Sequence, residues 1–168
     1  MKNIVCLFML CITLTHSFRM NAQGSCKTSK HRQFDFWLGR WDVFNPEGKK
    51  IGENTIHYLQ DSCLIQENWI ASQQTGTSYN YYDSNDDSWN QLWVDNTGTN
   101  LVLKGGYSDG KMILQSELLT SKRDKSYYRN QLVWELLADG RVLQSWHILS
   151  AEGKLLQTVF QGYYQKKK

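Results

Sequence analysis

From residue 40 onward, clusters of Asn, Asp, Gly and Ser interrupt the chain roughly every ten residues. The segments between these clusters are rich in β-branched and aromatic residues and have almost no helical periodicity. The connections are too short for a crossover helix, so consecutive strands have to pair as antiparallel neighbours. The sequence therefore predicts an all-β domain with strands at roughly 40–45, 49–59, 63–73, 77–83, 88–95, 99–106, 111–119, 126–137, 141–150 and 155–165.

A meander of about ten strands leaves two exposed edges unless the first strand pairs with the last. We therefore predict an antiparallel up-and-down β-barrel, and a two-sheet sandwich is the structural alternative. Residues 31–38 form the one segment that resembles a helical turn, and we expect it to cover one mouth of the barrel. The pair Gly105-Gly106 inside a predicted strand indicates a bulge or kink at a corner of the barrel.

The first 22 residues differ from the rest of the chain. Lys2 is followed by an almost wholly apolar run from Ile4 to Leu14, and the small residue Ala22 precedes Gln23. This pattern is typical of a secretory signal peptide over 1–22, and the run is too short for a spanning helix, which needs roughly 20 residues. We expect a mature domain over 23–168 without a transmembrane segment, exported to the periplasm or the extracellular space.

Two cysteines, Cys26 and Cys63, belong to the mature chain. An even pair in an exported protein is most simply a disulfide, which would tie the N-terminal segment to an early strand. Two free thiols or a metal pair are the alternatives, but no His-Cys spacing supports a zinc site. We predict a Cys26–Cys63 disulfide.

The charge balance does not favour a nucleic-acid partner. The whole chain carries a formal net charge of +3, from 19 Lys and Arg against 16 Asp and Glu. Removal of residues 1–22 takes away Lys2 and Arg19, which leaves 17 basic residues and a net charge of +1. The one basic run, at residues 166–168, is typical of a solvated tail.

A series of aromatic and polar motifs follows the first helical turn. It begins with Gly39-Arg40-Trp41 and continues with Glu67-x-Trp69, Asn80-x-Tyr82-Asp83, Trp89-x-Gln91-x-Trp93-Val94-Asp95, Trp134, Asp139-Gly140-x-Val142-x-Gln144-x-Trp146 and Phe160-Gln161-Gly162-Tyr163-Tyr164. Over residues 31–165 this series resembles a family of uncharacterised exported bacterial proteins with a lipocalin-like barrel of the calycin or nitrobindin kind. The resemblance implies that Trp41 closes the bottom of the barrel, and it implies no particular activity.

Period-two alternation predicts which side chains share a face of the sheet. An even pairing across the turn at 83–88 sets Asn80 opposite Gln91. In the last hairpin Gln144 and Trp146 fall on one face with Trp134, whereas a two-residue Asp139-Gly140 turn would shift this register by one. We predict that a small hydrophobic or amphipathic ligand is bound by Glu67, Asn80, Gln91, Trp93, Trp134, Gln144 and Trp146. The alternative is that the Trp residues are core or plug and the amides are structural hydrogen-bonding groups.

Catalytic motifs have little support in this sequence. The histidines have neither the spacing of a metal site nor a nucleophile beside them, so we predict no catalytic residues, no metal and no cofactor. Haem is the alternative, because nitrobindin-like barrels hold iron through one histidine near the C-terminal end. His147 is the candidate ligand.

These observations favour an exported, non-catalytic protein that holds a ligand inside a barrel. The second hypothesis is a structural or partner-binding protein of the cell envelope, for which an apolar patch outside strands 88–106 would be the sign. The third is an enzyme, for which a buried carboxylate with a raised pKa beside a cavity would be the sign.

Overall fold

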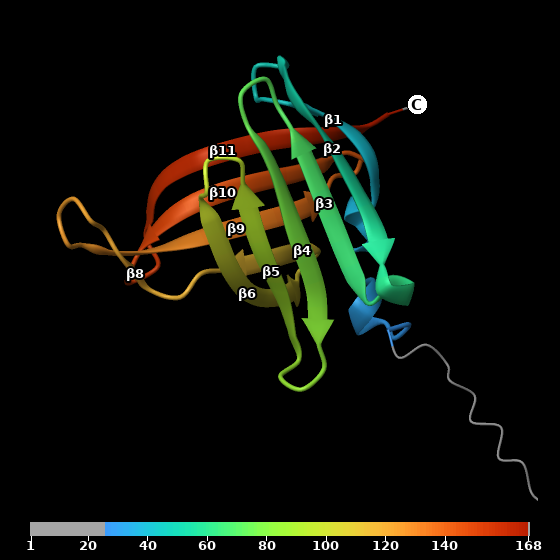
Figure 1. Ribbon diagram of the computed structural model, residues 1–168, viewed down its shortest axis with the longest axis horizontal. Helices are drawn as coiled ribbons and strands as arrows, with labels where there is room; N and C mark the ends of the chain where they lie inside the picture. The colour runs from blue at the N-terminus through green and yellow to red at the C-terminus, as the bar shows by residue number, and fades with distance from the viewer. Residues whose placement is uncertain (1–25, 168) are drawn as a thin grey trace, which may run out of the picture.

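The computed structural model describes residues 26–167 and forms a closed antiparallel barrel of ten strands, as predicted (Figure 1). Short 3-10 turns at Lys30–Arg32 (η1) and Asp35–Trp37 (η2) precede the barrel, and a third lies at Gln60–Ser62 (η3). The barrel strands are Gly39–Phe44 (β1), Lys50–Leu59 (β2), Leu64–Ile70 (β3), Thr75–Asp83 (β4), Ser88–Asp95 (β5), Asn100–Ser108 (β6), Lys111–Gln115 (β7), Tyr127–Leu136 (β9), Val142–Ser150 (β10) and Leu155–Lys166 (β11).

Closure of the barrel comes from the pairing of β1 with β11, in which Trp41 to Phe44 lie opposite Lys166 to Tyr163. A two-residue strand, Leu119–Thr120 (β8), pairs only with the start of β9. The sequence predicted one continuous strand over 111–119, but β7 ends at Gln115. The reason is that the Ser116 hydroxyl accepts the backbone N–H of Asn130 at 2.9 Å and replaces a backbone acceptor of the ladder.

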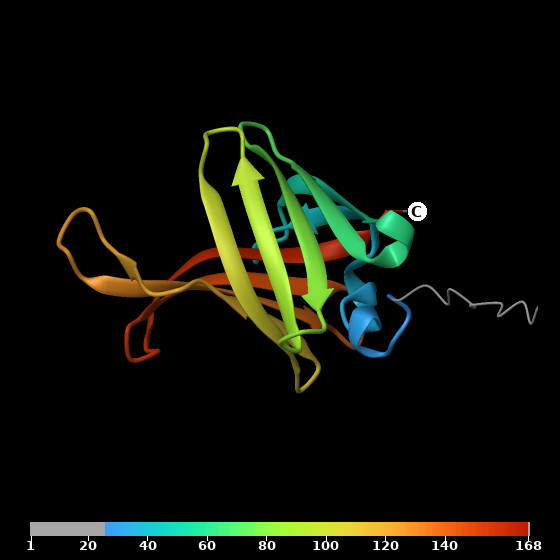
Figure 2. The ribbon, with the colours of Figure 1, turned by 60° about the horizontal axis from the view of Figure 1, so that its bottom comes forward.

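The barrel is flattened, with strands β2 to β6 crossing β9 to β11 (Figures 1 and 2). β6 forms one corner: its first half pairs with β5 and its second half with β7. Gly105 sits at that corner, where an added Cβ would lie 2.1 Å from the carbonyl oxygen of Ile113. The corner at Gly105-Gly106 is therefore confirmed, but the pairing runs through it without a register shift, so no bulge is present.

Aromatic side chains fill one end of the barrel. The N-terminal turns insert Phe34 and Trp37, which stack on each other with centroids 4.8 Å apart and are fully buried. Phe34 also meets Trp134 edge to face at 5.2 Å. Trp41 donates its indole N–H to the Trp37 carbonyl at 2.9 Å, which places it in the bottom of the barrel as expected. We call Phe34, Trp37, Trp41, Trp89 and Trp134 the aromatic plug.

A disulfide and one arginine hold the segment that carries the plug. Cys26 and Cys63 are bonded, which confirms the predicted pair. Arg32 donates from Nη2 to the carbonyl oxygens of Cys26 at 2.7 Å and Ser62 at 2.9 Å. Its Nη1 donates to the Tyr58 hydroxyl at 2.6 Å. These contacts fasten residues 26–37 to the end of β2 and to η3.

The predicted signal peptide, residues 1–22, lies outside the described residues. Within residues 26–167, no helix has the length and the apolar character needed to cross a membrane.

The corner at Gly105 generates a test of the fold. Gly105→Ala should lower the free energy of unfolding by about 2 kcal/mol, because the new methyl group collides with the backbone of β7 rather than with a movable side chain. The matched control is Gly106→Ala, where nothing lies within 4 Å of the new Cβ. Urea denaturation measures the free energy of unfolding of both variants. Equal stability of the two would contradict the close contact between Gly105 and the backbone of β7 at the corner.

Candidate functional site

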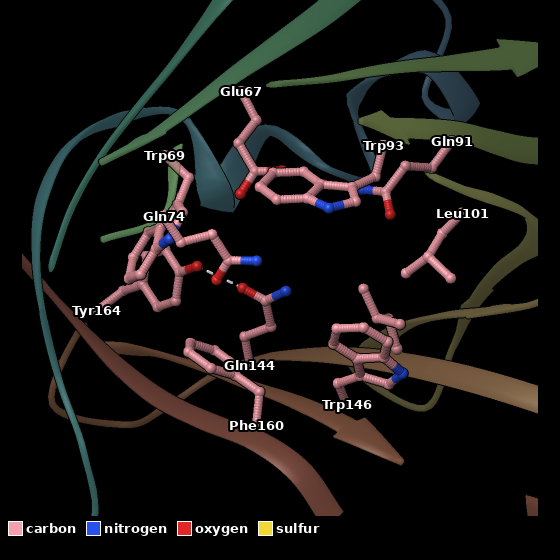
Figure 3. Close-up of a pocket in the computed structure, with 11 residues that line it drawn as sticks. Glu67, Trp69, Gln74, Gln91, Trp93, Leu101, Gln144, Trp146, Phe160 and Tyr164 are labelled. Atoms are coloured by element: carbon pink, nitrogen blue, oxygen red, sulfur yellow. Dashed lines mark hydrogen bonds between the residues drawn. The ribbon is translucent and has the colours of Figure 1, made fainter. Parts of the chain in front are cut away.

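An internal cavity of about 90 Å³ lies between the two faces of the barrel, and none of its lining residues belongs to the aromatic plug. It opens near the turn between β3 and β4, where Gln74 is exposed. Its walls come from β3, β5 and β6 on one side and from β9 to β11 on the other (Figure 3). The lining side chains are Glu67, Trp69, Gln74, Gln91, Trp93, Leu101, Leu132, Gln144, Trp146, Phe160 and Tyr164.

Glu67 is the buried acid of this cavity, with only 4% of its surface exposed. Asn54 Nδ2 donates to one of its carboxyl oxygens at 2.6 Å, and Ser78 Oγ donates to the other at 2.7 Å. Loss of hydration raises the pKa of Glu67 to about 7, although both hydrogen bonds act in the opposite direction. The side chain is therefore a mixture of the acid and the carboxylate near neutral pH.

A chain of amides extends from Glu67 along the barrel wall. Asn80 donates to Ser78 Oγ at 2.9 Å, and Gln91 Nε2 donates to Asn80 Oδ1 at 2.7 Å. Asn80 and Gln91 are direct partners in the β4–β5 ladder, as the sequence predicted. The carbonyl oxygen of Gln91, Oε1, is buried and accepts no hydrogen bond from any described residue. Asn54 Oδ1 is also unpaired there, but Asn54 does not line the cavity.

The opposite wall contributes a second amide. Tyr164 is buried and donates its hydroxyl hydrogen to Gln144 Oε1. With its oxygen engaged in this way, Gln144 directs its Nε2 group toward the cavity (Figure 3). The cavity thus has an open acceptor at Gln91 on one side and a donor at Gln144 on the other.

Aromatic rings form the rest of the wall. Trp69 and Phe160 meet at an interplanar angle of 85°, with centroids 6.0 Å apart. Trp69 lies over Gly52 and Trp93 lies over Gly76, where an added Cβ would come within 2.5 Å and 2.2 Å of the rings. These two glycines leave room for the indole rings against the neighbouring strands, which fixes the shape of the cavity.

The structure brings together most of the residues that the sequence predicted for the site. Glu67, Gln91, Trp93, Gln144 and Trp146 all line the cavity. The sequence left the register of the last hairpin open between two alternatives, and the structure has the one without the one-residue shift, with Gln144 opposite Trp134 and Trp146 opposite Leu132. Whether these side chains bind a ligand stays a prediction.

Two predicted residues do not line the cavity. Asn80 lies behind Gln91 and orients its amide. Trp134 points inward as expected but belongs to the aromatic plug, against Phe34 and Trp37. Alternation in a strand predicts the face but not the depth along the barrel axis, and depth depends on where the N-terminal turns insert.

The predicted ligand-binding residues do not include six side chains that line the cavity: Trp69, Gln74, Leu101, Leu132, Phe160 and Tyr164. Trp69 had a usable signal, because it alternates with Glu67 on β3. Phe160 and Tyr164 alternate in the same way on β11, where Gly162 lies between them. Gln74 comes from a turn, for which alternation provides no signal.

The structure does not support His147 as a haem ligand inside the barrel. His147 pairs with Gln131 and Thr158 on the outer face, and its Nδ1 is hydrogen bonded to Thr158 Oγ1 at 3.1 Å. Its neighbour Trp146 takes the inward position instead. Among residues 26–167, no three His, Cys, Asp or Glu side chains are arranged to hold a metal ion.

Comparison with known proteins adds no assignment. No protein-family model matches the chain, and no curated protein matches it either. The resemblance to exported lipocalin-like proteins therefore stays a prediction, and function has to be argued from the cavity.

The raised pKa of Glu67 generates a test of the site. Its pKa is about 7 in the folded chain against an ordinary value of 4.5, so the folded state binds more protons between these pH values. The stability that this group contributes is complete below about pH 4.5 and is lost as the pH rises through about 7, by up to roughly 3 kcal/mol. Tyr164, the other titratable side chain of the lining, stays neutral because burial raises its pKa further above 10.

We expect Glu67→Gln to lose this pH dependence, because Gln does not ionise, and to be more stable than the wild type at pH 8, where the wild type holds a buried carboxylate. Thermal unfolding between pH 5 and pH 8 measures the difference. The matched control is Glu135→Gln, which removes an outward carboxylate paired with Lys111 at 3.0 Å. If wild type and Glu67→Gln had the same pH slope, Glu67 would not be titrating in this range.

Proposed function

We propose that this protein is an exported, non-catalytic binding protein that holds a small, partly apolar ligand in the barrel cavity. The observation that carries the proposal is the buried, unpaired Oε1 of Gln91 beside the Trp and Phe rings. An unpaired buried acceptor costs about 1–3 kcal/mol, and a ligand that donates to it recovers this free energy. Apolar walls with a few convergent polar groups are the usual composition of a small-molecule site.

The size of the cavity limits the ligand. About 90 Å³ exceeds the roughly 30 Å³ that one water occupies in the liquid. It is well below the roughly 300–1,000 Å³ of pockets that enclose drug-sized molecules. The cavity therefore suits a compact ligand, or the head of a longer one whose remainder leaves past Gln74.

Export is part of the proposal. It is supported by the pattern of a signal peptide over 1–22 and by the Cys26–Cys63 disulfide, because structural disulfides persist mainly in oxidising compartments.

Glu67 also meets the criterion set above for an enzyme, a buried carboxyl with a raised pKa beside a cavity. Binding is favoured because both of its carboxyl oxygens are engaged by Asn54 and Ser78. The other titratable group of the described lining, Tyr164, donates to Gln144 and has a pKa too high for a base at neutral pH. The hydroxyl beside Glu67, that of Ser78, is fully buried and does not line the cavity, so it is not placed to attack a molecule bound there. A single acid without an accessible nucleophile or a second acid–base group in the described lining does not form a catalytic set.

Filling the cavity tests the binding function. Native mass spectrometry of the chain, expressed with its own N-terminus and purified without refolding, should show a retained mass that disappears under denaturing conditions. Leu101→Phe should abolish the retained mass, because Leu101 lines the cavity. Val102→Phe, at the next position with 67% of the side chain exposed, should keep it.

The same spectra give the mass of the polypeptide itself, which should be that of a chain whose first residue is Gln23. A wild-type spectrum that shows the bare chain mass alone would reject the binding function. Retention of the extra mass by Leu101→Phe at the wild-type level would also reject it.

A second candidate function, partner binding, is favoured by the outer face of the barrel. Tyr79, Leu92 and Val102 form a row across β4, β5 and β6, and 40%, 43% and 67% of their surfaces are exposed. This row is an apolar patch of the kind expected for a protein-binding surface. If the partner is a second copy, the sedimentation coefficient should rise with concentration, and Leu92→Glu combined with Val102→Glu should abolish the rise. A concentration-independent coefficient for the wild type would exclude self-association.

A further inference from the structure

The lining of the cavity is electron-rich. It contains the Glu67 carboxyl, the open carbonyl oxygen of Gln91 and five large aromatic side chains. No Lys, Arg or His belongs to the described lining. An anionic ligand would find no counter-charge there and would meet the acid of Glu67, whereas aromatic rings and a carboxylate both attract a cation.

The shape of the cavity favours a rounded group over a flat ring. Trp69 and Phe160 stand at 85° to each other and form a corner rather than the parallel slot that a planar ligand stacks into. The volume of about 90 Å³ is also smaller than the roughly 150 Å³ of an engineered cavity that holds benzene. A group of four or five heavy atoms with methyl groups directed at the rings matches both constraints.

We propose that the cavity binds a small protonated amine, free or as the head of a longer molecule, with Glu67 as its counter-ion and Gln91 Oε1 as the acceptor of its N–H. This inference rests on the proposed binding function and names the ligand class. Glu67 and Gln91 approach the cavity from β3 and β5, while the rings of Trp93, Trp146 and Phe160 surround it (Figure 3).

Binding of a cation requires ionised Glu67, which makes affinity depend on pH. Around the Glu67 carboxyl, β2 and β4 present the uncharged Asn54 and Ser78, and β11 presents Tyr164. The hydroxyl of Tyr164 stays neutral at these pH values, so Glu67 alone changes charge in this surrounding. With a pKa of about 7, most Glu67 is protonated at pH 6 and most is ionised at pH 8. The affinity for an amine that stays protonated should therefore rise about ten-fold over this range, with release of a proton on binding at pH 6.

The experiment compares two probes of similar shape on the purified chain. Trimethylammonium carries a charge, one N–H and three methyl groups, whereas tert-butanol carries an O–H and three methyl groups without a charge. Titrations followed by tryptophan fluorescence and calorimetry at pH 6 and pH 8 give the affinities. Trimethylammonium should bind about ten-fold more tightly than tert-butanol at pH 8.

The variants separate charge from shape. Glu67→Gln should lose both the preference for trimethylammonium and its pH dependence, while the surface control Glu135→Gln keeps both. If Glu67→Gln does not fold, the two probes at two pH values on the wild type still decide the question.

The outcomes also separate this inference from the function on which it rests. If tert-butanol binds as tightly as trimethylammonium, or if the affinity for trimethylammonium does not change with pH, the proposal of an amine ligand is overturned and the cavity remains a site for neutral ligands. If neither probe binds and native mass spectrometry finds no retained molecule, the binding function itself is overturned.

Discussion

The pairing of β1 with β11 is the contact on which the other features of this molecule depend. It leaves no long open edge, and it turns every second side chain of ten strands toward one enclosed volume. The aromatic plug fills one end of that volume, with Arg32 and the Cys26–Cys63 disulfide holding its N-terminal part in place. The cavity lies in the part of that volume that the plug does not fill.

The polar groups inside the barrel are the second feature that needs a physical reason. A barrel of this size could be filled with apolar side chains, which avoid the loss of hydration that Glu67 and Gln91 suffer. Most of the interior polar atoms satisfy one another through Asn54, Ser78 and Asn80. This network leaves Asn54 Oδ1 and Gln91 Oε1 without a partner and Glu67 with a raised pKa, and of these three residues Gln91 and Glu67 line the cavity. Uncompensated groups of this kind are typical of functional sites.

Most of the fold could be predicted because its signals are local. Turn residues define where strands end, and the turn at 84–87 alone sets Asn80 opposite Gln91. The division of the 111–119 segment was missed, because it depends on the Ser116 hydroxyl meeting Asn130, a residue 14 positions away. The candidate site was predicted in part for the same reason. Alternation grouped the inward side chains of β3 and β5 but left the inward face of β10 open. It placed Trp134 at the cavity, and it offered nothing for Gln74 in a turn.

The sequence by itself determined most strand positions, the antiparallel order, the pairing of Asn80 with Gln91 and that of the two cysteines, because each follows from residue types at short spacing. Only the tertiary structure decided how far along the barrel axis each inward side chain lies. That depth separates Trp134 in the plug from Trp146 at the cavity. It depends on the stagger of strands, on the corner at Gly105 and on the insertion of Phe34 and Trp37, which are contacts between residues far apart in the chain.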